Sequence, residues 1–207
     1  MSNNNKIRPV DKYEGSKNKD GLPHGKGKNI SIGVDGKISL IEEGVWKNGF
    51  LVEGSETLFG NQQNDGSYAI KKEVGKWRFD EKKNYCEEYL SGEGKELYYK
   101  NEKDFKNDKP MGYVKGIFDD GSLLKGEVYN AYLIGYSEES FIKKIIIDGK
   151  AKKNSVRIKL GKVFFENGDR YEGEIEYDMP QGKGTMHYKE DGTHLEGEWV
   201  NGNLKED

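Results

Sequence analysis

The chain has 207 residues, of which 33% are hydrophobic, 34% are charged and 12% are aromatic, and glycine occupies 28 positions. The shortage of aliphatic residues excludes an ordinary thick globular core, since typical domains have roughly 45–50% apolar residues with glycine counted, while the aromatic and glycine content excludes a simple disordered chain. The net charge of −3 argues against a polyanion-binding protein, and the single Cys86 excludes an internal disulfide bond and a cysteine-based zinc site.

Glycine-centred strands are predicted from near the start of the chain. The phrase Tyr13-Glu14-Gly15 is followed by looser copies around Gly44 and Gly75, each with a tryptophan two residues later, Trp46 and Trp77. Because clearer copies near the C-terminus alternate with a period of two, we expect strands here as well.

Residues 50–123 match the repeated phrase only poorly. We expect insertions around residues 60–66 and 81–88, and residues 101–109 fit no register of the repeat. The phrase then returns as Leu124-Lys125-Gly126-Glu127-Val128.

A basic segment follows at residues 143–162. Val156, Ile158 and Leu160 alternate there with Arg157 and Lys159, which predicts a strand with anchored aliphatic side chains and a cationic outer face. A solvated polar face and a contact for acidic lipid headgroups or an acidic partner both fit this pattern. The basic residues of this segment are Lys143, Lys144, Lys150, Lys152, Lys153, Arg157, Lys159 and Lys162.

The clearest copies of the phrase lie near the C-terminus. They are Tyr171-Glu172-Gly173-Glu174-Ile175 and Leu195-Glu196-Gly197-Glu198-Trp199, with glycines 24 residues apart. Their period-two alternation places Tyr171, Gly173 and Ile175 on one strand face and the glutamates on the other. Gly149 precedes Gly173 by the same 24 residues, so we expect Gly149 on the row of strand glycines.

Turns are predicted between these strands. Pro23, Pro110 and Pro180 each begin a Pro-x-Gly stretch, and proline with glycine favours a tight turn. Most Asp-Gly pairs mark the crossing to the next hairpin, and Asn201-Gly202 closes the last phrase.

These phrases resemble the repeats of the MORN (membrane occupation and recognition nexus) family. The resemblance implies an all-β fold: an elongated, single-layer, curved meander of about six to eight antiparallel hairpins over residues 13–203. Tails are expected at 1–12, which show no signal peptide, and at 204–207. Family members act as scaffolds in cilia and the cytoskeleton, at membrane junctions, and as grooves for partner helices.

A single-layer ribbon leaves an apolar face that needs cover. Curl of the ribbon, a second copy or a partner helix laid in a groove would each provide it. The residues expected along this aromatic groove are Tyr171, Ile175, Met186, Tyr188, Leu195, Trp199, Trp46 and Trp77.

Sequence motifs for catalysis, phosphate binding or metal binding are incomplete in this chain. Cys86 lies in a charged insertion without a base beside it, and the glycine-lysine stretches lack the Ser or Thr of a phosphate loop. A metal site from His187 with Glu172 or Glu174 lacks a second nitrogen ligand. We therefore expect no catalytic, cofactor or metal site.

The expected function is a non-enzymatic scaffold that binds a partner helix or peptide along the aromatic groove, within a cytoskeletal or ciliary assembly in the cytoplasm. The alternative is a peripheral tether that binds acidic phospholipids through residues 143–162. Self-association is compatible with both hypotheses, and a nucleic-acid partner is not expected.

Overall fold

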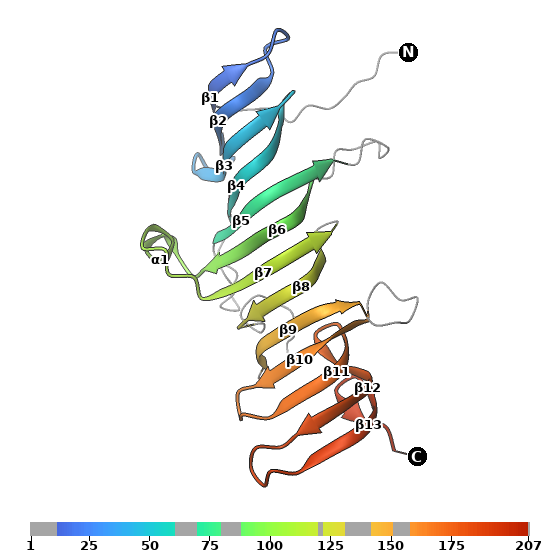
Figure 1. Ribbon diagram of the computed structural model, residues 1–207. Helices are drawn as coiled ribbons and strands as arrows, with labels where there is room; N and C mark the ends of the chain where they lie inside the picture. Colours follow the sequence, from blue (N-terminus) through green and yellow to red (C-terminus); the bar gives the residue numbers. More distant parts are fainter. Residues whose placement is uncertain are drawn as a thin grey trace.

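The computed structural model is a single open antiparallel sheet in which each strand pairs with its neighbours in sequence order (Figure 1). It describes residues 12–60, 70–79, 88–119, 122–130, 142–150 and 158–206, of which 72% are in strands. The strands are β1 (Lys12–Lys17), β2 (Pro23–Ile32), β3 (Ile38–Lys47), β4 (Phe50–Phe59), β5 (Ile70–Phe79), β6 (Glu88–Tyr99), β7 (Gly112–Asp119), β8 (Ser122–Tyr129), β9 (Ile142–Lys150), β10 (Lys159–Phe165), β11 (Arg170–Glu176), β12 (Met179–His187), β13 (His194–Val200) and β14 (Asn203–Leu204).

This architecture confirms the predicted all-β meander. The fourteen strands of the described residues form seven hairpins, and the sheet makes an elongated, twisted ribbon with β1 near one end and β13 near the other (Figure 1). Residues 101–109, which fit no register of the repeat, contain the short helix α1 (Glu102–Lys106). Its N-cap is Asn101, whose side chain accepts a hydrogen bond from the Asp104 N–H.

Asparagine–glycine pairs close two of the hairpins. Asn48 and Gly49 connect β3 to β4 with φ values of 50° and 93°, and Asn201 and Gly202 connect β13 to β14 with 48° and 84°. Two successive residues with positive φ form the type I′ turn, whose twist matches that of the flanking strands.

The prediction that Pro-x-Gly stretches form turns is wrong. Pro23 begins β2, Pro180 is the second residue of β12, and Pro110 lies just before β7. Proline is tolerated at the beginning of a strand, where its missing N–H removes little from the ladder. The turn before β12 is formed instead by Tyr177 and Asp178, with φ values of 49° and 64°.

A row of glycines crosses the sheet near the middle of the strands. Gly44 pairs with Gly27 on one side and with Gly54 on the other. At Gly54, φ is 144° and an added Cβ would lie 2.2 Å from the carbonyl oxygen of Glu43, so no other residue fits. Further along, the row continues through Gly94, Gly116 and Gly126, and then through Gly161, Gly173, Gly184 and Gly197.

In β9 this row passes through Ile147, and the expectation that Gly149 lies on it is wrong. Ile147 pairs with both Gly126 and Gly161, whereas Gly149 pairs with Leu160. The pairing register of β9 and β10 shifts between Leu160 and Gly161. A bulge adds a residue to one strand, so the regular spacing of glycines in the sequence no longer marks the row.

The main core lies along one face of the ribbon and includes one aromatic pair in the C-terminal repeats, while Ile70 and Tyr99 are buried on the other face, where Tyr99 contacts Phe105 of α1. Tyr171 and Trp199 meet edge to face, with ring centroids 5.5 Å apart. Trp199 Nε1 donates a hydrogen bond of 3.0 Å to the Gly184 carbonyl. Both rings are buried in the same apolar cluster.

The N-terminal hairpins repeat this arrangement. Tyr13 and Trp46 meet edge to face at 5.4 Å, and Trp46 Nε1 donates a 3.1 Å hydrogen bond to the Gly27 carbonyl. Equivalent contacts near the two ends of the chain indicate that the repeated phrase builds the same structural unit at both places.

Candidate interaction surfaces

The ribbon itself covers most of the aromatic strip that was expected to face a partner. Tyr171 is 0% exposed and Trp199 is 2% exposed. Tyr188 packs partly buried against the same core, and Leu195 remains 44% exposed near the last edge of the sheet. The other buried members of the strip are Ile175, Met186, Trp46 and Trp77. Cover by the chain itself was one of the three forms of cover expected.

Two lysines of the basic segment form ion pairs with carboxylates of neighbouring strands. Lys144 forms an ion pair with Glu127, and Lys162 Nζ lies 2.9 Å from Glu172 Oε2. Lys143 is exposed. Lys152, Lys153, Arg157 and the side chain of Lys150 lie outside the described part of the chain.

The predicted orientation of Leu160 and Lys159 is wrong. Leu160 is 41% exposed, whereas Lys159 pairs with the buried Ile175 and shares its face. The core residue of this strand is Val163, four positions after Lys159, so the aliphatic side of β10 is shifted by one residue. A shift of one residue exchanges the two faces of a strand.

A groove of about 520 Å³ crosses strands β6 to β9. Its lining includes Ile117 and Ile146, which alternate with the buried Phe118 and Ile145, so the groove opens on the face opposite the core. Ile117 is 44% exposed. The backbone of Gly94, Gly116 and Gly126 also lines the groove.

One wall of the groove is an ordered cluster around Glu127. The Glu127 carboxylate contacts the ammonium groups of Lys115, at 2.6 Å, and of Lys144, and it accepts a 3.0 Å hydrogen bond from the Tyr113 hydroxyl. The hydrogen bond from Lys115 is the largest cause that lowers the pKa of Glu127 to about 2. Tyr113 also stacks on Tyr129, with ring centroids 5.4 Å apart.

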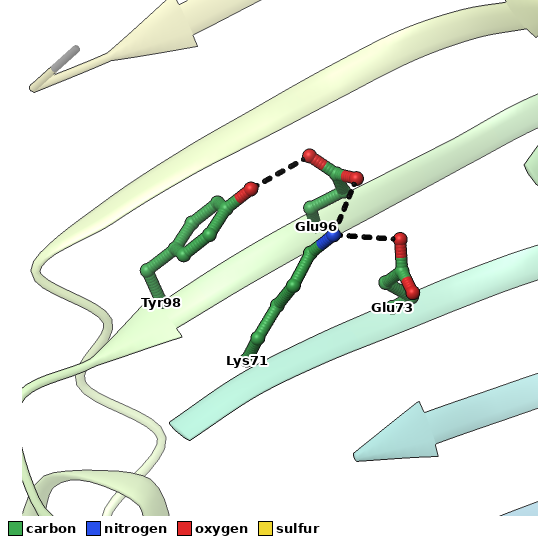
Figure 2. Close-up of polar contacts among 4 residues, drawn as sticks. All are labelled: Lys71, Glu73, Glu96 and Tyr98. Atoms are coloured by element: carbon green, nitrogen blue, oxygen red, sulfur yellow. Dashed lines mark hydrogen bonds and ion pairs between the residues drawn. The ribbon is translucent and has the colours of Figure 1, made fainter. Parts of the chain in front are cut away.

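A second polar cluster lies on β5 and β6 (Figure 2). Lys71 Nζ lies 2.9 Å from Glu73 Oε1 and 3.0 Å from Glu96 Oε1, and the Tyr98 hydroxyl donates a 2.8 Å hydrogen bond to Glu96. Burial raises the pKa of Glu73, and the Lys71 charge opposes that rise.

This cluster belongs to a row of carboxylates that sequence patterning missed. Glu42, Glu56, Glu73 and Glu96 pair consecutively across β3 to β6, and Val114 of β7 continues the row. Each of these residues stands two positions from a glycine of the glycine row. Residues two positions from such a glycine face the core. This spacing is therefore the sequence signal by which the core-facing carboxylates could have been predicted.

No group of three or more metal-binding side chains occurs among the described residues, and no helix there is long and apolar enough to cross a membrane. No model of a known protein family matches the chain, and no curated protein matches it.

Proposed function

We propose that this chain is a MORN-repeat protein and acts as a non-enzymatic scaffold that binds a protein segment in the groove across β6 to β9. The exposed Ile117, which lines the groove together with Ile146 two strands away, is the observation that carries this proposal. An apolar hollow rimmed by polar groups is typical of a binding site. The matching Tyr–Trp contacts at the two ends of the ribbon support the repeat assignment.

The rim of the groove indicates the chemistry of the partner. Glu93, Lys125 and Asp148 line it and have no ion pair among the described residues. Together with the Glu127 cluster, in which one carboxylate contacts two lysines, the rim has three carboxylates and three ammonium groups. It therefore favours a segment that presents an aliphatic side chain flanked by polar groups. A helix or an extended peptide would present side chains in this way.

The floor of the groove is suited to close backbone contact. The groove floor between Ile117 and Ile146 is formed by strand backbone, including that of Gly116 and Gly126, so a partner's aliphatic group would contact the sheet there. The cluster around Glu127 holds one wall in place, so little ordering would be needed on binding.

The alternative of a tether to acidic phospholipids has less support. Lys144 and Lys162 already contact Glu127 and Glu172, which offsets part of the positive charge that it requires. A cytoplasmic, cytoskeletal or ciliary setting is part of the proposal and rests on the family resemblance, as does self-association of copies.

The proposal is tested with two matched charge substitutions in the full chain. Ile117→Glu places a carboxylate in the groove, and Val200→Glu places one at an equally exposed position in β13, at 43%. Affinity capture from a native lysate should retain a protein with the unaltered chain and with Val200→Glu but lose it with Ile117→Glu. Equal capture by the two variants would refute binding at this groove.

A further inference from the structure

Two of the three histidines meet on the face of the ribbon opposite the core. His187 of β12 and His194 of β13 are direct cross-strand partners, and their ring centroids lie 6.0 Å apart. The adjacent Met186 is buried in the core, so alternation directs the histidines to the other face. His187 is half-buried and His194 is exposed.

The hydrogen-bond pattern brings these two side chains close together. The Tyr188 N–H donates to the Thr193 carbonyl at 2.9 Å, one residue beyond the histidine pair. The histidines therefore occupy a non-hydrogen-bonded position of the antiparallel ladder. At such positions Cα atoms are only about 4.5 Å apart and the side chains approach most closely.

Two imidazoles arranged in this way form a chelating pair. Neutral imidazole nitrogen is a preferred ligand of Zn²⁺, Cu²⁺ and Ni²⁺, with metal–nitrogen bonds of about 2.0–2.1 Å for zinc. We propose that His187 and His194 together bind one divalent transition-metal ion, which links β12 to β13. The sequence pattern lacked a second nitrogen ligand beside His187, and the strand register supplies it.

The charges around the pair are compatible with a bound cation. Arg170 of β11 is the other cross-strand neighbour of His187, and its Nε lies 2.9 Å from Glu172 Oε1, a carboxylate that it shares with Lys162. Glu196 lies two residues from His194 on the same strand face and has no ion pair among the described residues. Because the described residues offer no group of three ligands, water would complete the coordination shell.

The test is isothermal titration of the full chain with Zn²⁺ at pH 7.5, in parallel with His187→Gln, His194→Gln and the control His24→Gln, which alters an exposed histidine of β2. We expect one ion per chain, at least tenfold weaker binding in either paired variant, and no change in the control. The same titration with Cu²⁺ should give tighter binding with the same pattern among the variants.

A further readout separates this site from unspecific surface binding. Zn²⁺ should raise the melting temperature of the unaltered chain and of His24→Gln but not of His194→Gln, because the ion stabilises only a folded pair of strands. Equal affinity of the unaltered chain and both paired variants would overturn the proposal.

Discussion

Glu73 and Glu96 lie directly opposite each other on β5 and β6, and both carboxylates contact the Lys71 ammonium, at 2.9 and 3.0 Å (Figure 2). Like charges placed opposite each other on a sheet are destabilising. Lys71 compensates for this repulsion in a half-buried setting where water screens little of it. The lysine is therefore expected to be essential to the stability of the two strands.

Lys71→Met should lower the free energy of unfolding by about 2 kcal/mol at pH 7, because it leaves two half-buried carboxylates without a cation. The folded-state pKa of Glu73 is already raised, and removal of the lysine raises it further. A raised pKa favours the folded state at low pH, so the loss should shrink as the pH falls toward 4.5. Urea unfolding at both pH values measures this.

The matched control is Lys76→Met, which changes an exposed residue on the opposite face of β5. It should cost less than about 0.5 kcal/mol, as ordinary surface substitutions do. Equal losses in the two variants would contradict a specific role for Lys71.

The glycine row is tested by comparing Gly54→Ala with Gly36→Ala. An added Cβ at Gly54 meets a backbone carbonyl oxygen at 2.2 Å, whereas the turn residue Gly36, with φ of 77°, has nothing within 4 Å. We expect a loss of at least about 3 kcal/mol at Gly54 and about 1 kcal/mol at Gly36, where only the backbone conformation is strained. Thermal unfolding of both variants measures the difference, and similar losses would show that the row tolerates side chains.

Asp178, in the turn between β11 and β12, is expected to cost stability at neutral pH. Burial raises the pKa of its carboxyl from 3.8 to about 6, although the Lys159 charge opposes the rise. A raised folded-state pKa means that stability falls as the pH rises from about 4 to 6. Asp178→Asn should thus gain on the order of 1 kcal/mol at pH 7 and nothing near pH 3. If denaturant unfolding shows the same gain in stability at both pH values, the raised pKa of Asp178 is not the reason for the gain.

Local residue chemistry predicted the strands and their order. The Tyr-Glu-Gly phrases mark strand centres, and Asn201-Gly202 forms the turn between β13 and β14. Both could be predicted because the backbone conformation at these residues depends on few distant contacts. Pro180 was misassigned because proline with glycine suits both a turn and the beginning of a strand.

Face and partner assignments depend on register, which the sequence alone does not contain. The bulge beside Gly161 moved Ile147 onto the glycine row, and the cross-strand pairing of His187 with His194 became visible only with the strands aligned. The exposed Ile117 could not be distinguished from a core residue, because its hydrophobicity gives no indication of what covers it.

Occupation of the groove across β6 to β9 by a protein partner can be detected by crosslinking. A photo-reactive amino acid is placed at position 117 in the full chain and activated in native cells, with the same residue at position 200 as control. We expect covalent adducts with a protein at position 117 and none of these adducts at position 200. An absence of adducts at 117, or identical adducts at both positions, would contradict it.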